Sequence, residues 1–276
     1  MVDVDGVETL PRQLWLIGGT QESRQLATAL AAAQIPHVIT VVTPEAAGLY
    51  APSPWCQVQV GAIAPEALTH FFTTYNIAAV LDASHPFAVE ISQTAIAACT
   101  HHPLPYLRYE RPQATPQPDV SGVNTALVQT IASYDEILTD AVLAGERVLL
   151  TLGSRHLYRF QPWHNRASLF ARILPTFTAL RAALAAGFDP TRLIALRPPI
   201  SIELESALWQ QWQITQVITK ASGAPGGEVV KRSLAQQLGI RLWILARPDL
   251  AYPCQTEDLQ TAIAFCHQQL GQNQPK

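Results

Sequence analysis

The chain has 276 residues, 48% of them hydrophobic and 14% charged, so it can bury large cores and is not an intrinsically disordered protein. Its length favours two domains over one, although single domains of this size exist. The formal net charge of -3, with no Lys/Arg stripe along a domain, excludes an overall basic field, so nucleic acid is not expected as a partner.

The first part of the chain predicts a complete doubly wound domain. Short apolar runs alternate with longer helical patterns, as is typical of βαβ units and a mostly parallel sheet. In the first predicted helix, Leu26 and Leu30 are spaced so that they share one face. Strands are expected at residues 14–17, 37–42, 57–60, 77–82 and 105–109, and helices at 21–34, 65–75 and 86–100.

A linker and a second domain are expected after this. Residues 111–119 hold three prolines and no apolar period, which is typical of a linker. Strands are then expected at 147–152, 168–174, 192–196, 215–220 and 241–246, and helices at 134–143, from 154, and at 176–186, 201–212, 227–238 and 256–270. The predicted fold is α/β, with two Rossmann-like doubly wound parallel-sheet domains, residues 12–113 and 114–276, facing a cleft.

The cysteines do not indicate a metal site, and the N-terminal residues do not indicate export. The four cysteines are scattered and form no C-x-x-C pair, so buried reduced thiols are expected. Residues 1–11 are acidic and lack the basic and apolar regions of a signal peptide. No apolar run approaches the roughly 20 residues that a membrane span needs. We therefore expect a cytoplasmic protein without a membrane partner.

The loop after the first predicted strand is a candidate cofactor site, because open α/β sheets bind ligands beyond the carboxyl ends of their strands. Gly18 and Gly19 allow a tight turn and a close approach of a ligand, and the N–H groups that begin the next helix attract phosphate. The loop lacks the full G-x-G-x-x-G pattern. Dinucleotide binding and a plain tight turn therefore both stay open.

A second candidate loop, residues 82–87, follows the fourth predicted strand. Ser84 is a suitable N-cap for the helix that Pro86 opens. His85 is a candidate to bind a ligand carboxylate or to supply a proton, because histidine side chains titrate near neutrality. Both residues thus have a structural and a functional interpretation.

The third and fourth candidate loops belong to the second predicted domain. In the third, Gly153, Ser154 and Arg155 bring a glycine, a capping serine and a cation together after a strand. The fourth, residues 220–227, combines a lysine with three glycines, which is typical of a loop that cradles an anion. It does not match the P-loop, because its lysine precedes the glycines and an acidic residue follows them.

Several other catalytic and metal motifs are absent from the sequence. It contains no G-x-S-x-G nucleophile elbow, which removes the simplest argument for an α/β hydrolase. His101 and His102 have no carboxylate or cysteine at ligand spacing, so no metal site is expected.

Five short segments match one known family in order and spacing. They are LIGGTQE (16–22), DASHPF (82–87), YLRYERP (106–112), TKASG (219–223) and ARP (246–248). Each is short, but together they extend over about residues 14 to 250. On these segments the chain resembles the precorrin-6A reductase or cobalt-precorrin-6A reductase family of cobalamin biosynthesis.

This resemblance implies an NAD(P)H-dependent enzyme that reduces one double bond of the precorrin-6A or cobalt-precorrin-6A macrocycle to give precorrin-6B. The cofactor would be NADPH or NADH, and the partner a small-molecule tetrapyrrole. The predicted cofactor contacts are Gly18, Gly19, Thr20, Glu22 and Thr43. The predicted substrate contacts are Ser84, His85, Gly153, Ser154, Arg155, Lys220, Ser222 and Gly223, with His85 and Lys220 as catalytic residues.

A tetrapyrrole of this kind is a flat, mostly apolar ring with many carboxylates, so it requires cations at the rim of its site. The cofactor would supply the hydride, and the protein position and electrostatics. Each cation also has an interpretation as a solvated surface charge. The candidates are Arg108, Arg111, Arg155, Arg172, Lys220 and Arg232.

Two other functions stay open at this stage. A nucleotide-sugar or short-chain reductase would share the glycine turn, but it would also need a Tyr-x-x-x-Lys pair, which the sequence lacks. A two-domain module that binds a small molecule would not need that turn. The end of the second predicted strand offers Thr43 and Glu45 but no arginine for a 2′-phosphate, so NADH and NADPH also stay open.

Overall fold

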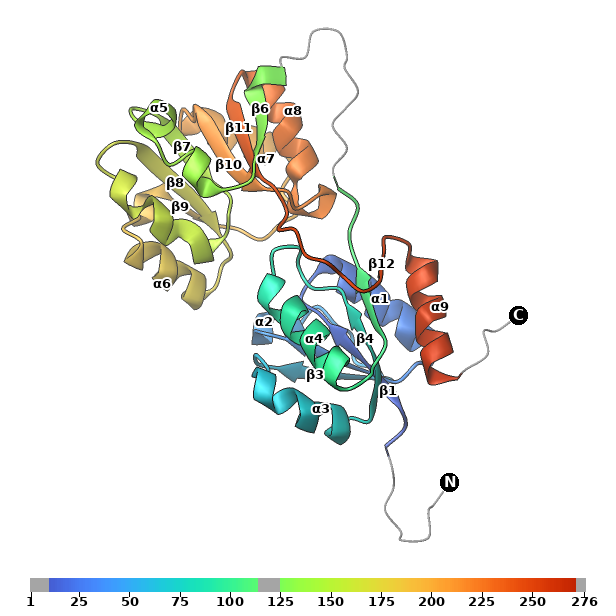
Figure 1. The fold of residues 1–276 in the computed structure, drawn as a ribbon. Coiled ribbons are helices and arrows are strands. Elements are labelled where there is room, and N and C mark those ends of the chain that lie inside the picture. Colours follow the sequence, from blue (N-terminus) through green and yellow to red (C-terminus); the bar gives the residue numbers. More distant parts are fainter. Residues whose placement is uncertain (1–9, 114–124, 272–276) are drawn as a thin grey trace, which may run out of the picture. The chain divides into compact units, whose positions relative to one another are not determined.

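The chain forms two units, each built on a six-stranded sheet. The computed structural model describes residues 10–113 and 125–271 (Figure 1). Unit 1 contains the residues up to Pro112 and those from Pro248 onward, and unit 2 contains Gln113–Arg247. Every strand pairing in both sheets is parallel. The predicted α/β class with two doubly wound parallel sheets is confirmed.

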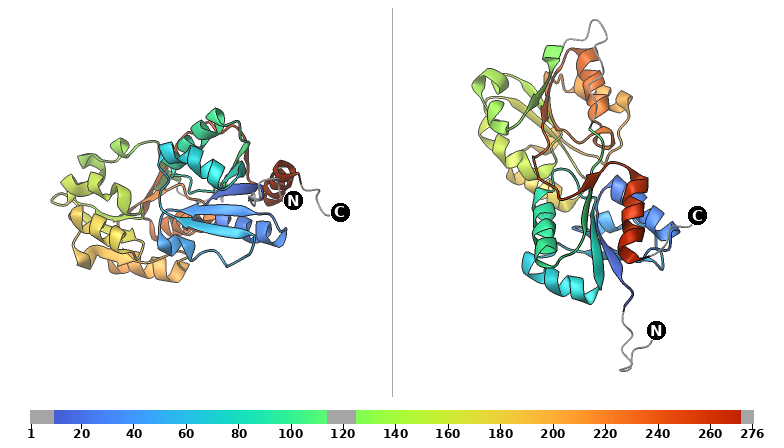
Figure 2. Two further views of the ribbon diagram at one scale, coloured as in Figure 1. Left: turned by 90° about the horizontal axis from the view of Figure 1, so that it is seen from below. Right: turned by 45° about the vertical axis from the view of Figure 1, so that its right-hand side comes forward.

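Unit 1 has the strand order β12-β5-β4-β1-β2-β3, with helices on both faces of the sheet (Figures 1 and 2). Its strands are β1 (Gln13–Ile17), β2 (His37–Val41), β3 (Cys56–Val60), β4 (Ile77–Asp82), β5 (Tyr106–Tyr109) and β12 (Gln255–Thr256). Its α-helices are α1 (Gln21–Ala32), α2 (Pro44–Ala47), α3 (Leu68–Thr74), α4 (Val89–His101) and α9 (Leu259–Leu270).

The central strand β1 shows why this sheet forms. All its residues are buried, and successive side chains point to opposite faces. Leu14 and Leu16 belong to a core with residues of α1 and α9, whereas Trp15 and Ile17 pack with α3 and α4. A strand that is covered on both faces requires a continuous apolar run, and this run made β1 predictable.

Unit 2 has the strand order β6-β11-β10-β7-β8-β9. Its strands are β6 (Val128–Ile131), β7 (Arg147–Leu150), β8 (Ser168–Ile173), β9 (Leu193–Ala195), β10 (Gln216–Lys220) and β11 (Arg241–Leu245). Its α-helices are α5 (Asp140–Leu143), α6 (Phe177–Ala185), α7 (Ile202–Gln211) and α8 (Glu228–Leu238), and 3₁₀ turns run through Ser154–Trp163. On one face, Trp209 of α7 and Leu234 of α8 pack on the sheet.

The two sheets exchange their sixth strands. Both have the Rossmann arrangement 3-2-1-4-5-6, in which the sixth strand lies beside the fifth. In unit 1 this place is taken by β12, which the chain reaches only after unit 2; in unit 2 it is taken by β6, which follows β5 of unit 1. The residues from Pro248 onward therefore belong to unit 1, which corrects the predicted second domain of 114–276.

Several predicted elements differ in the structure. The helix expected at 134–143 is a 3₁₀ turn, Tyr134–Glu136, followed by the short helix α5. Helix α4 begins at Val89 rather than near residue 86, because the Ala88 N–H bonds to the His85 carbonyl in a turn. Strands β6 and β12 were not predicted. Most of the predicted linker 111–119 lies outside the described residues.

Two further expectations concern buried cysteine thiols and membrane-spanning helices. All four cysteines are free thiols, but only Cys99 and Cys266 are buried, while Cys254 is exposed. In residues 10–113 and 125–271, no helix has the length and apolar character needed to cross a membrane.

Candidate functional site

The four candidate loops lie at the two topological switch points. In unit 1 the strand order reverses between the neighbours β1 and β4, and in unit 2 between β7 and β10. At such a point the two connections leave the sheet in opposite directions, which opens a crevice at the carboxyl ends of the strands. The predicted loops follow these four strands, so the structure brings them together in pairs: 18–23 with 82–87 in unit 1, and 151–156 with 220–227 in unit 2.

The glycine turn after β1 requires both of its glycines. A Cβ on Gly18 would collide with the Tyr50 hydroxyl and lie 2.8 Å from Ile39 Cγ2. Gly19 has φ +98°, which favours glycine, and nothing lies within 4 Å of a Cβ added there. Gly18 is therefore needed for packing inside the unit, whereas Gly19 faces open space that a ligand can approach.

Hydrogen bonds within unit 1 fix this turn. Gly19 N–H donates to Tyr50 Oη at 2.7 Å, and the same hydroxyl lies 2.7 Å from Ser23 Oγ. Thr20 caps α1 in a capping box with Ser23, and its hydroxyl donates to the Ala83 carbonyl at 2.8 Å. That last bond ties the turn after β1 to the loop after β4. The sequence offered no signal for Tyr50.

The other two predicted cofactor contacts have partners of their own. Glu22 is buried and forms an ion pair with Arg111, with Oε2 and Nη2 2.8 Å apart. Thr43 accepts a hydrogen bond from Ala46 N–H at 3.3 Å and so caps the short helix α2. The carboxylate of Glu22 thus acts within the protein, while Thr43 is exposed at the carboxyl end of β2.

Substitutions of Gly18 and Gly19 are expected to destabilise the protein for different reasons. Gly18→Ala forces its Cβ onto the Tyr50 hydroxyl and should lower the free energy of unfolding by about 1–3 kcal/mol. Gly19→Ala meets no atom but strains a positive φ, at roughly 1–2 kcal/mol. Tyr50→Phe removes the nearer of the two clashing atoms and leaves Ile39 Cγ2, so Gly18→Ala should cost less in that background without becoming neutral. Urea unfolding of the single and double variants tests this, and strictly additive losses for Gly18→Ala and Tyr50→Phe contradict it.

A buried network of charge lies at the end of β4. Asp82 is fully buried, and one oxygen accepts from Arg108 Nη1 and Ser84 N–H, both at 2.9 Å. Its other oxygen accepts from the hydroxyls of Ser92 and Tyr106, both at 2.6 Å. Burial, followed by the Asp82 charge, raises the pKa of Tyr106 far above its usual range, so the phenol keeps its proton.

This network holds the backbone next to His85. Arg108 donates from Nη1 to Ser84 Oγ and from Nη2 to the Ser84 carbonyl, both at 3.0 Å, so Ser84 is not an N-cap. His85 Nδ1 accepts from Phe87 N–H at 3.1 Å. In the neutral ring the proton therefore lies on Nε2, which fixes His85 as a donor from that atom.

The strand that returns from unit 2 supports Arg108. Arg108 N–H donates to the Cys254 carbonyl at 2.9 Å, next to β12. The Tyr252 ring lies 5.2 Å from the Arg108 guanidinium carbon, a cation–π distance. Glu110 adds a second ion pair at 3.0 Å. Arg108 is 1% exposed, so it does not lie at the rim of a site as we had expected.

The switch point of unit 2 is cationic. Lys220 ends β10, and Arg155 and His156 lie in the loop after β7. Burial, and secondarily the charge of Arg155, lowers the pKa of Lys220 to about 8. Burial also lowers the pKa of His156, with Lys220 as the next cause. The charges of Lys220 and Arg155 disfavour one another, so an anion bound beside them would be stabilised.

The predicted rim cations divide into two groups. Among the described residues, four are in ion pairs: Arg108 with Asp82 and Glu110, Arg111 with Glu22, Arg172 with Glu205, and Arg232 with Glu228. Arg155 and Lys220 come from the two loops that meet at the switch point of unit 2.

The glycine loop after β10 is held by residues that sequence reasoning missed. Gly223 has φ +69°, and its N–H donates to Glu228 Oε2 at 3.0 Å. Ser222 is buried against Gly226, where a Cβ would collide with the serine hydroxyl. Glu228 therefore fixes the start of the loop from the first turn of α8.

Lys231 fixes the other end of this loop. It is 2% exposed, and its ammonium donates to the carbonyls of Gly226 and Gly227 at 2.9 and 3.2 Å. Its position three and four residues before the buried Leu234 and Ala235 places it on the core face of α8. That spacing was the one signal that could have identified it.

The stability of unit 2 should depend on pH through Lys231. Burial, and then the charge of Arg172, lowers its pKa to about 7, although Glu205 and Glu228 oppose this shift. An unfolded lysine titrates at about 10.4, so between the two pKa values the unfolded state binds more protons than the folded one. The free energy of unfolding therefore rises with pH in this window, by at most about 1.4 kcal/mol per pH unit. Lys231→Met should lack this rise. Urea unfolding of both proteins at several pH values from 7 upward tests it, and parallel curves contradict it.

Comparisons with known proteins agree with this architecture. The model of the family "Precorrin-6x reductase CbiJ/CobK" matches residues 13–267. A cobalt-precorrin-6A reductase of Synechocystis is 45% identical, covering 97% of this chain and 99% of its own length. One from Priestia megaterium is 32% identical, covering 86% and 91%. The solved structure "CobK precorrin-6A reductase" has a TM-score of 0.75 at 22% identity, covering 96% of this chain and all of the other.

The two 3-2-1-4-5-6 sheets, with glycine loops at their switch points, define a protein with two Rossmann-type units. The family match and the full-length relatives narrow this class. The chain belongs to the precorrin-6x reductase family, a family of oxidoreductases in cobalamin biosynthesis.

Proposed function

We propose that this chain reduces one double bond of cobalt-precorrin-6A with NAD(P)H, giving cobalt-precorrin-6B. The relatives from Synechocystis and Priestia megaterium, which match it over more than 90% of their own length, carry the name cobalt-precorrin-6A reductase. The structural observation that carries the proposal is the Arg155–Lys220 pair at the switch point of unit 2. It supplies the cations that a ring with many carboxylates needs, in a chain with a net charge of -3.

For the cofactor we propose the glycine turn of unit 1. The open side of Gly19 admits a close approach, and the N-terminus of α1 attracts a pyrophosphate. Gly18 and Thr20 would act by fixing the turn. Thr43 lies at the end of β2, where Rossmann domains place the ribose, and is the proposed contact there. Glu22 would act through its ion pair with Arg111.

Reduction of a double bond consumes one hydride and one proton. The nicotinamide supplies the hydride when bound. Lys220 is the proposed proton donor, because a pKa of about 8 leaves most of it protonated at neutral pH while keeping the ammonium acidic enough to react. His85, with its proton on Nε2, is proposed to donate a hydrogen bond to the macrocycle. The chemistry requires no covalent nucleophile.

The remaining proposed substrate contacts have supporting roles. Gly153 adopts φ +73° before the turn that carries Ser154 and Arg155. Ser222 and Gly223 begin the loop that Glu228 holds. Ser84 is committed to the Arg108 network, so its proposed effect on the substrate passes through the position of His85.

The decisive experiment is anaerobic turnover by the purified protein. Cobalt-loaded and metal-free precorrin-6A are each incubated with NADPH or NADH, and cofactor oxidation is followed together with the mass of the tetrapyrrole. Turnover should add two hydrogens to the macrocycle for each cofactor oxidised, with the cobalt-loaded substrate preferred. Tetrapyrrole binding without turnover in all four mixtures would instead indicate a binding module.

A further inference from the structure

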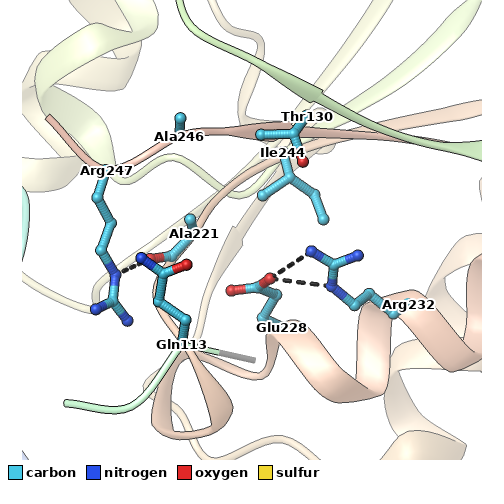
Figure 3. A pocket seen from close by; sticks show the side chains of 8 residues that line it. All are labelled: Gln113, Thr130, Ala221, Glu228, Arg232, Ile244, Ala246 and Arg247. Atoms are coloured by element: carbon cyan, nitrogen blue, oxygen red, sulfur yellow. Dashed lines mark hydrogen bonds and ion pairs between the residues drawn. The ribbon is translucent and has the colours of Figure 1, made fainter. Parts of the chain in front are cut away.

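A small polar pocket in unit 2 lies outside the site proposed so far. Its volume is about 180 Å³, and it lies at the carboxyl ends of β10 and β11 (Figure 3). Ala221 follows β10, Arg247 follows β11, and Arg232 reaches the pocket from the second turn of α8. The pocket therefore lies on the edge of the sheet where α/β proteins bind ligands.

Two guanidinium groups in its wall have defined orientations. Arg247 donates from Nε to the Ala221 carbonyl at 2.9 Å. Arg232 donates from Nε and Nη2 to Glu228 Oε1 at 3.0 and 2.9 Å. Figure 3 shows the two arginines on opposite sides of the pocket, with Glu228 between them. With two arginines and one glutamate, the lining carries one positive charge in excess.

The size and charge of the pocket select a kind of ligand. Whole small molecules occupy sites of roughly 300–1,000 Å³, so a pocket of 180 Å³ suits one arm of a larger molecule. A planar guanidinium matches the geometry of a carboxylate or a phosphate. Glu228 disfavours a multiply charged anion, and this favours a single carboxylate over a phosphate.

We propose that this pocket binds a carboxylate arm of the tetrapyrrole, with Arg247 as its principal contact. Unit 2 would then hold the macrocycle rim at two places on either side of β10: Lys220 and Arg155 toward β7, and Arg247 and Arg232 toward β11. Neighbouring strands lie about 4.8 Å apart, so two such places fall within the width of one macrocycle. This inference rests on the proposed function, because it takes its ligand from it.

The test measures the tetrapyrrole and the cofactor separately. Arg247→Gln, Arg247→Lys and Arg232→Gln are compared with wild type in titrations with cobalt-precorrin-6A alone and with NADPH alone, and in KM for each. The exposed Arg181→Gln on α6 is the matched control. Arg247→Gln should weaken tetrapyrrole binding about tenfold to a hundredfold and leave NADPH binding unchanged. Arg247→Lys keeps the charge but not the planar fork, so its tetrapyrrole affinity should lie between those of wild type and Arg247→Gln.

Three outcomes overturn the proposal. The first is wild-type tetrapyrrole affinity in folded Arg247→Gln and Arg232→Gln. The second is a loss of NADPH affinity alone, which assigns the pocket to a cofactor phosphate. The third is an equal loss in Arg181→Gln, which indicates a general charge effect. Thermal unfolding verifies the fold of each variant. A wild-type protein that binds the tetrapyrrole but does not reduce it defeats the proposed function, while the titrations still test the pocket.

Discussion

Lys220→Met is expected to lower kcat by about 10²- to 10⁴-fold, the usual contribution of a positioned general acid. Lys220 ends β10 at the switch point of unit 2, partly buried and close enough to Arg155 for that charge to lower its pKa to about 8. Methionine has a similar length but carries no proton. Single-turnover measurements with saturating NADPH isolate the chemical step from binding.

The pH dependence of the reaction identifies the donor. An acid must be protonated to act, so kcat/KM, which reports the free enzyme, should fall as pH rises through about 8, the pKa of Lys220. Arg155→Ala removes a charge that lowers this pKa, so the alkaline limb should move to higher pH. A limb that stays in place in Arg155→Ala, or that persists in Lys220→Met, contradicts this role. A wild-type limb nearer the usual histidine range would point to His85 instead.

Arg108→Met is expected to lower the free energy of unfolding by about 3–5 kcal/mol, the usual cost of leaving a buried charge without its partner. Asp82 is fully buried and Arg108 is 1% exposed, so water cannot replace the lost contact. The variant also removes the hydrogen bonds that Arg108 donates to the hydroxyl and the carbonyl of Ser84. A loss of this size is a large part of the roughly 5–15 kcal/mol that stabilises a domain.

A second substitution distinguishes the ion pair from simple packing. Asp82→Asn removes the stranded charge, so the double variant Asp82→Asn with Arg108→Met should be more stable than Arg108→Met alone. Urea unfolding of the three variants measures this coupling. If Asp82→Asn makes Arg108→Met worse, the lost volume of Arg108, rather than its charge, is the cause.

The parts of the fold that could be predicted from sequence are those encoded locally. Strands such as β1 and β4 are buried on both faces, so they appear as unbroken apolar runs. Strand β12 has only two residues and β6 is half polar, so neither carries such a pattern. The exchange of sixth strands could not be predicted, because it depends on which strands pair, and no local sequence pattern determines this pairing.

The candidate site likewise has parts that could be predicted from sequence and parts that could not. Loops after strands could be predicted, because chain order and the parallel sheet place them at one edge. The positions and partners of long side chains could not be predicted in this way. Arg108 was expected at a rim, but it lies within β5, and a charged residue inside a buried strand is itself a sign of an internal partner. Lys231 is a similar case on the core face of α8.

The exchanged strands also constrain how the protein is made on the ribosome. Unit 2 is encoded without interruption, so it has all of its strands as soon as Arg247 has emerged. Unit 1 begins earlier and ends later, because β12 and α9 are synthesised after the whole of unit 2. Until then β5 remains an open edge, and Arg108 lacks both Tyr252 and the Cys254 carbonyl. The nascent unit 1 therefore exposes a strand edge and an incomplete charge network throughout the synthesis of unit 2, which is the interval when it is most prone to mispair.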